Sequence, residues 1–312
     1  MSDYAYVAER ARKAFSSVAN LEKILDRNPR DKGILLNLSA MKKVAEQAQR
    51  ELLRLAEINR IEVCNYRLIP YQSVGYALPF VAKSLLNYQN LFSQIYDAIR
   101  NGVLKERAVL GKDAEFESML EYGYSYSGSL GVVLLAQSER DFFKGRLDEP
   151  IDALFQVLDI ADTDSVKDVA RSLGNAVVKR VFDWSVVNVE GKFSADVRWS
   201  RSDGRQLGQV VERRQMERIV DLVGATSDET SNPVNVRGML VGTDLPARLF
   251  HFVVPGGDSY KGAFHKDLSI GKELVVGKLY DAEIVTFEKF HYATEKTERR
   301  NFLKKLTFIG EE

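Results

Sequence analysis

The sequence predicts an α+β protein made of three units. These are an N-terminal antiparallel helical hairpin or bundle, a middle domain in which helices cover a mixed or antiparallel sheet, and a small C-terminal β-barrel that is OB-like or SH3-like. Residues 1–59 carry a heptad apolar stripe, residues 60–224 alternate helix and strand patterns, and residues 234–312 hold short strands separated by turns. The small, polar segment at 225–233 predicts a linker between the last two units.

Two helices are predicted before residue 60, because apolar residues recur there at steps of three and four. Pro29 separates the helices and favours a turn, so we expect them to fold back on each other. Phe15 and Ile24 flank the stripe and make it wider than a helical pair covers. We therefore expect a third helix or a partner subunit to pack on the hairpin. The stripe consists of Val7, Ala11, Ala14, Val18, Leu21, Leu25, Ile34, Leu38, Met41, Ala45, Ala48, Leu52 and Leu55.

The middle unit is predicted to contain a sheet of about five strands with helices against it. The helix expected over 78–101 is the candidate for the third member of an N-terminal bundle. A further helix is expected from about 163 to 184, because its apolar residues keep helical spacing throughout. Turns at 127–129 and 202–204 predict two hairpins, which make the sheet antiparallel or mixed.

The C-terminal unit is predicted to be a barrel, because short strands of regular spacing are separated by turn residues. The sequence Pro-Gly-Gly-Asp at 255–258 is one clear turn. The expected strands are 236–241, 248–254, 259–265, 273–276, 279–287 and 302–309.

Composition and charge predict a soluble, cytoplasmic protein. The 312 residues include 44 Lys and Arg and 44 Asp and Glu, so no global basic field attracts nucleic acid. The single cysteine, Cys64, excludes an intramolecular disulfide and is expected to be a small buried hydrophobe. No apolar run approaches the roughly 20 residues that a membrane span needs, so we expect no membrane association.

A nucleotidyltransferase-like site is one candidate for catalysis. A Gly-Ser turn ending at Ser129 is followed by Glu139 and Asp141, and enzymes of this class hold Mg²⁺ with two carboxylates after such a turn. Asp196, on a later predicted strand, would supply a third ligand. The details argue against the site, because Arg140 stands where a strand would carry an apolar residue. The segment after the turn is also typical of a strand rather than of a phosphate-binding helix.

A nucleic-acid-binding face is the second candidate. Basic and aromatic residues are interleaved on neighbouring strands of the predicted barrel, and OB-type surfaces stack single-stranded bases on aromatic rings beside a basic groove. The face shared by Phe250 and Phe252 fits the barrel core better, and a charged run at the end of a hairpin is usually solvated. The candidate residues are Arg248, Tyr260, Lys261, Arg299, Arg300 and Lys304.

These observations lead to three functional hypotheses. The first is a non-catalytic interaction or assembly protein that forms a homo-oligomer or binds a protein partner through its N-terminal helices, with a ligand or partner docked on the barrel. The alternatives are a nucleic-acid-binding component of a bacterial defence or regulatory complex and, last, a Mg²⁺-dependent nucleotidyltransferase-like enzyme. The sequence holds no Cys and His at metal-binding spacing and no cofactor motif, so neither a metal nor a cofactor is expected under the first hypothesis.

Overall fold

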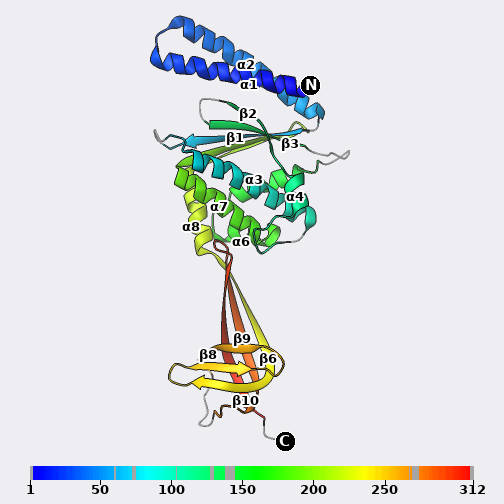
Figure 1. The fold of residues 1–312 in the computed structure, drawn as a ribbon, viewed down its shortest axis with the longest axis vertical. Coiled ribbons are helices and arrows are strands. Elements are labelled where there is room, and N and C mark those ends of the chain that lie inside the picture. The colour runs from blue at the N-terminus through cyan, green and yellow to red at the C-terminus, as the bar shows by residue number, and fades with distance from the viewer. Residues whose placement is uncertain are drawn as a thin grey trace. The chain divides into compact units, whose positions relative to one another are not determined.

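The computed structural model describes residues 3–59, 61–71, 75–102, 104–126, 130–137, 145–266, 268 and 274–309. The chain divides into two compact units, Met1–Ala225 and Thr226–Glu312, and the predicted α+β class is confirmed (Figure 1). The predicted hairpin and middle domain lie together in the first unit, because the hairpin packs on the sheet of that domain. Each described helix is too short or too polar to cross a lipid bilayer.

The predicted N-terminal helical pair is confirmed as α1 (Asp3–Arg27) and α2 (Lys32–Asn59). Near the turn the two helices bury their stripes against each other, with Val18 and Leu38 in a shared cluster. Farther from the turn, Leu52 packs against Val63 of the sheet. Phe15, which widens the stripe, stacks on Tyr124 of the sheet with 6.1 Å between the ring centroids. The chain's own sheet therefore covers Phe15, whereas Ile24, the other residue that widens the stripe, is 44% exposed.

The sheet of the first unit has the strand order β2-β3-β1-β4-β5, and all neighbouring strands are antiparallel. The hairpin lies on one face and the remaining helices pack on the other (Figure 1). The strands are β1 (Ile61–Pro70), β2 (Glu121–Tyr126), β3 (Leu130–Gln137), β4 (Phe193–Ser200) and β5 (Gln206–Val211). The helices are α3 (Leu78–Asn101), α4 (Lys112–Glu117), α5 (Asp148–Leu158), α6 (Thr163–Leu173), α7 (Asn175–Gly191) and α8 (Arg213–Ala225).

The prediction that α3 joins an N-terminal bundle is wrong, because α3 lies on the opposite face of the sheet from the hairpin (Figure 1). Side chains alternate across a strand, so neighbouring residues of β1 contact different helices. Val63 faces the hairpin, whereas Cys64 lies 3.3 Å from the hydroxyl of Tyr88 on α3. Helical spacing showed that α3 is amphipathic, but the face of the sheet that it covers depends on this tertiary packing.

The helix predicted from 163 to 184 is two helices, α6 and α7, which meet at Gly174. This glycine has a φ of 91°, and a Cβ placed on it would lie 2.9 Å from the backbone of Lys105. A larger residue at this position would clash with Lys105. The positive φ of Gly174 interrupts the helical backbone between α6 and α7. Asp162 caps α6, since its carboxylate accepts a hydrogen bond from the backbone N–H of Ser165 at 2.8 Å.

In the described part of the second unit, five strands pair in a closed ring. β6 (Ser227–Asp244) pairs with β7 (Leu249–Val253), β7 with β8 (Ser259–Phe264), β8 with β10 (Lys296–Phe308), β10 with β9 (Leu279–His291), and β9 with β6. Residues 274–278, which include most of a predicted strand, form a loop. The ring encloses a core of Leu240, Phe250, Phe252, Tyr260, Phe264, Tyr280, Ala282, Ile284 and Leu303.

The predicted linker is instead the first part of β6, because its backbone pairs with β9 from Ser227–His291 through Pro233–Val285. The side chains of this segment are mostly exposed, which explains why its composition is small and polar like that of a linker. Its backbone is nevertheless hydrogen-bonded to β9. Residues 227–235, 285–291 and 296–300 form a three-stranded extension of the ring, which we call the β-ribbon.

Candidate functional site

The nucleotidyltransferase hypothesis is represented in the described structure by Asp196 alone, because Ser129, Glu139 and Asp141 lie outside the described residues. The Asp196 side chain is almost fully buried on β4. It accepts hydrogen bonds from Arg67 at 2.8 Å and from Arg198 at 2.9 Å. Within the part of the chain that the structure describes, no group of three or more His, Cys, Asp or Glu side chains could hold a metal ion.

Asp196 instead forms part of a groove on the sheet. The hairpin covers β2, β3 and part of β1, whereas the hairpin-side face of β4 and β5 forms a pocket of about 460 Å³. Leu53 of α2 forms one wall of this groove, and the floor is the sheet. The groove is lined by Leu53, Asn65, Asp196, Arg198, Trp199, Ser200, Gln206, Leu207, Gly208, Gln209 and Val210.

Strand register brings Arg67 of β1 next to the two charged residues that line the groove, Asp196 and Arg198. Arg67 of β1 pairs directly with Asp196 of β4, and Arg198 pairs with Gly208 of β5. Arg198 lies close over this glycine, since a Cβ placed on Gly208 would be 3.2 Å from Cγ of Arg198. Two guanidinium groups thus share one carboxylate, and the Asp196 hydrogen bond and charge raise the pKa of Arg198.

Tyr126 of β2 lies at the border of this charged group. Its ring contacts Phe15 of the hairpin, with 5.6 Å between the centroids. Burial raises the pKa of Tyr126, and the charge of Arg67 partly opposes that rise. The phenol therefore stays neutral at ordinary pH.

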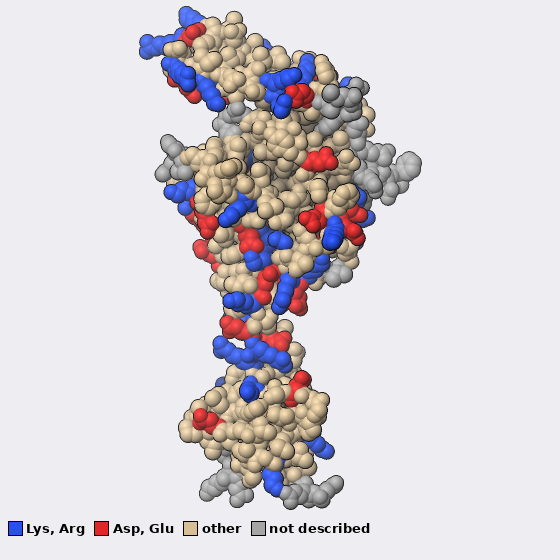
Figure 2. All heavy atoms as spheres, viewed as in Figure 1, with Lys and Arg blue, Asp and Glu red and all other residues tan. Residues whose placement is uncertain are grey.

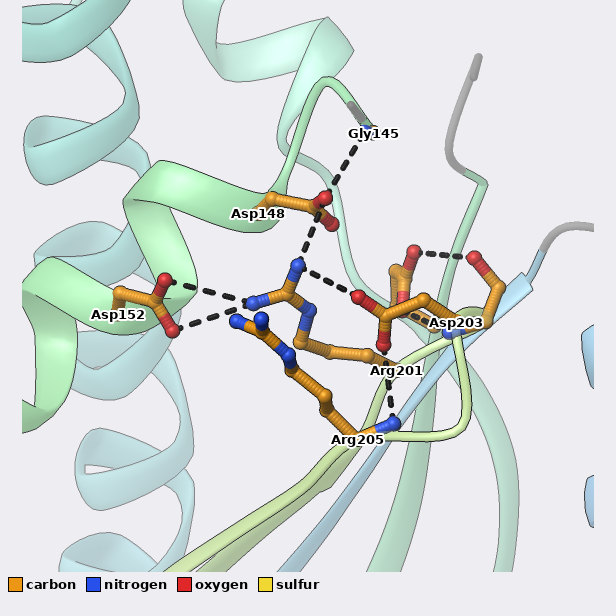
Figure 3. A network of polar contacts seen from close by, with 8 residues as sticks. Gly145, Asp148, Asp152, Arg201, Asp203 and Arg205 are labelled. Carbon is orange, nitrogen blue, oxygen red and sulfur yellow. Dashed lines mark hydrogen bonds and ion pairs between the residues drawn. The ribbon is translucent and has the colours of Figure 1, made fainter. Parts of the chain in front are cut away.

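A second charged network surrounds Arg201, whose side chain is 4% exposed (Figure 3). Its guanidinium contacts Asp148 at 2.7 Å, Asp203 at 2.8 Å and Asp152 at 3.2 Å. Asp203 also accepts a hydrogen bond from the backbone N–H of Arg205 at 2.9 Å. The network joins the turn between β4 and β5 to the start of α5. The guanidinium of Arg201 lies among the three aspartates, in the place that a bound cation would take.

Cys64 is not a nucleophile in this arrangement. The thiol is fully buried, and burial raises its pKa to about 12. Since the thiolate is the reactive form, this cysteine is unreactive near neutral pH. The expectation of a small buried residue is met.

The candidate nucleic-acid residues occupy different environments. The prediction that Tyr260 contacts nucleic acid is wrong. This residue is 6% exposed and belongs to the barrel core, where it cannot stack on a base. Arg248 is exposed and donates to the backbone carbonyl of His265. Lys261 is exposed on β8.

The other three candidates form ion pairs. Arg299 pairs with Glu288 at 3.6 Å, Arg300 with Glu298 at 3.4 Å and Lys304 with Glu283 at 3.0 Å. On the face that Figure 2 shows, acidic and basic side chains lie next to each other on the β-ribbon. These cations are therefore partly neutralised.

A mixed aromatic and basic surface lies on the outside of the barrel, and its aromatic members are not among the residues predicted from the sequence. Phe302 of β10 pairs with Ala263 of β8 and with Val285 of β9, and Arg300 pairs with Phe287. The rings of Phe287 and Phe302 meet edge to face, 5.4 Å apart. Alternation along β9 and β10 would have found both rings. We call this surface the outer patch; it consists of Lys261, Ala263, Val285, Phe287, Arg300 and Phe302.

Comparison of the chain with protein-family models, with curated protein sequences and with solved structures gives no significant match.

Proposed function

We propose that this chain is a non-catalytic interaction protein and that its C-terminal barrel is an OB-type module that docks a protein partner. The observation that carries the proposal is the strand order. In OB barrels the first strand pairs with the second and the fourth, and the third runs parallel to the fifth. β6 pairs with β7 and β9, and β8 runs parallel to β10, which favours an OB-like over an SH3-like barrel.

The outer patch is the proposed docking surface. OB modules bind ligands on the second and third strands and on the loops between strands one and two and between strands four and five. The outer patch includes Lys261 of the third strand and lies where β9 and β10 run toward their connecting turn. Phe287 is 42% exposed, and exposed aromatic rings are typical anchors at protein interfaces.

A protein partner fits the charge of this unit better than a polyanion does. Residues 226–312 contain twelve Lys and Arg against thirteen Asp and Glu. Several of the cations are paired, as for Lys289 with Glu229 at 3.0 Å. Nucleic-acid binding draws its affinity from unpaired basic groups that displace counterions from phosphates.

The experiment is affinity purification of the full chain followed by a direct binding measurement with the purified partner. We expect Phe287→Asp to weaken binding at least tenfold. Val241→Asp is the matched control, because Val241 is a similarly exposed apolar residue on β6. Equal binding by both variants would place the partner elsewhere and remove the outer patch from the proposal.

Single-stranded nucleic acid is the second candidate ligand, and Lys261 and Arg300 beside two outward aromatic rings favour it. Fluorescence polarisation with a labelled single strand at low salt separates the candidates. Binding that weakens with salt and is lost in Lys261→Glu would replace the protein partner with nucleic acid. Unchanged polarisation would exclude nucleic acid.

Assembly through the N-terminal helices remains a prediction. The width of the stripe supports it only in part, because Tyr124 and neighbouring sheet residues cover Phe15 whereas Ile24 is exposed. Light scattering of the full chain measures the oligomeric state directly, and a strict monomer would exclude homo-oligomerisation.

A further inference from the structure

We propose that the groove over β4 and β5 binds a small organic anion, whose carboxylate or phosphate group is held by Arg198. This site lies in the first unit and does not depend on the function proposed for the barrel. Three features support it: the local charge, the polar side chains that line the groove and the volume.

The charge of the groove favours an anion. Asp196 is the single carboxylate among the described residues that line it, and two guanidinium groups share that carboxylate. Arg198, which lines the groove, and Arg67, which contacts the lining residue Asp196, together leave one positive charge that Asp196 does not neutralise. Arginine presents its N–H groups in a planar fork that matches carboxylate and phosphate oxygens, so it suits this role better than lysine.

Arg198 is positioned to reach a ligand. Its Nε–H donates to Asp196 at 2.9 Å, which holds the stem in place across Gly208. Its side chain is 64% exposed and lines the groove, so a ligand in the groove can reach it. Arg67 is held by the other oxygen of Asp196 at 2.8 Å. Asp196 is therefore a positioning residue for both arginines.

Neutral polar groups and size define the ligand further. Asn65, Ser200 and Gln206 line the same pocket and can bind hydroxyl or amide groups of a ligand. The volume of about 460 Å³ lies within the range of small-molecule sites. An organic acid or a phosphate monoester of metabolite size fits both the volume and the polarity.

Isothermal titration calorimetry of the full chain tests the proposal, with succinate and inorganic phosphate as separate probes at constant ionic strength in a buffer without polyanions. We expect saturable one-to-one binding of at least one probe. Binding of succinate alone identifies a carboxylate site, and binding of phosphate alone identifies a phosphate site. No saturable binding of either probe up to tens of millimolar would overturn the proposal.

Two variants locate the binding. Arg198→Gln should weaken it at least tenfold, and Gly208→Val should weaken it similarly, because the new side chain would displace Arg198. Arg171→Gln is the matched control, since Arg171 is also exposed and pairs with an aspartate, but on α6. Near-ultraviolet circular dichroism checks that each variant is folded. Unchanged binding by a folded Arg198→Gln variant would refute the site, and Gly208→Val supplies the test if that variant does not fold.

Discussion

Trp199 of β4 donates its indole N–H to the hydroxyl of Tyr88 on α3, at 2.9 Å, in the core between the sheet and the helix that covers it. The same hydroxyl lies 3.3 Å from the thiol of Cys64. All three side chains are fully buried or nearly so, so this oxygen satisfies polar groups that water cannot reach.

Replacing Tyr88 with Phe should therefore lower the free energy of unfolding by about 1–3 kcal/mol, because the indole N–H of Trp199 loses its partner inside the core. Urea denaturation followed by circular dichroism measures the change. Tyr122→Phe is the control, since Tyr122 is 64% exposed on β2 and its hydroxyl can bind water. Equal stability of the two variants would mean that the buried hydrogen bond contributes nothing.

Leu52→Ala should destabilise the first unit by about 2–5 kcal/mol, because the side chain is completely buried between the hairpin and the sheet. Leu36 lies on the same helix but is 74% exposed, so Leu36→Ala should change stability by less than about 0.5 kcal/mol. Chemical denaturation of both variants makes the comparison. A harmless Leu52→Ala would contradict packing of the hairpin on the sheet.

Arg201→Met should cost about 3–5 kcal/mol of stability, because the change leaves Asp148 and Asp203 close together without their shared cation. Arg10→Met is the control. Arg10 pairs with Glu51 on the surface, and such exposed pairs contribute only about 0–1 kcal/mol. A loss in Arg201→Met no larger than that in Arg10→Met would contradict a stabilising role of the buried network.

Asp162 should make folding depend on pH. The backbone N–H of Ser165 donates to its carboxylate and lowers the pKa of Asp162 in the folded state. Because the pKa of Asp162 is lower in the folded state than in the unfolded state, the ionised carboxylate stabilises the fold at pH values above its unfolded-state pKa. This stabilisation is lost as the pH falls through the folded-state pKa. Asp162→Asn keeps a cap without the charge, so its thermal midpoint should fall less between pH 6 and pH 3 than that of the unaltered chain. Asp221→Asn removes an exposed carboxylate from α8 and serves as the control; an identical fall in all three proteins would contradict the prediction.

Gly262→Ala should weaken the barrel, because a Cβ at this position would lie 2.0 Å from the backbone oxygen of Asn301 on the neighbouring strand. The β8–β10 pairing closes the ring, so proteolysis should cut residues 226–312 sooner in this variant. Gly242→Ala is the control, since its nearest neighbour would be Cβ of His251 at 3.6 Å. Equal protease resistance would indicate that the ring tolerates separation of β8 and β10.

The candidate groove could be only partly predicted from the sequence. Asp196 stood out as a carboxylate on a predicted strand, but its partner Arg67 lies 129 positions earlier in the chain. Strand order alone brings β1 beside β4, and no local pattern specifies that order. Alternation along β9 and β10 places Phe302 and Phe287 of the outer patch on the outside of the barrel, whereas their edge-to-face contact depends on the register between the two strands.

The sequence by itself determined the elements whose periodicity is strong: the helical pair with its buried Ala48 and Leu52, the class of the fold and the two hairpins of the sheet. These follow from local spacing, because a residue's place in a 3.6-residue or two-residue repeat decides which side of its element it occupies. Tertiary structure decided what each side meets. It placed the hairpin on the sheet instead of on α3, and it converted a polar linker into the first half of β6, because apolar area is buried and backbone groups are paired wherever the whole chain allows.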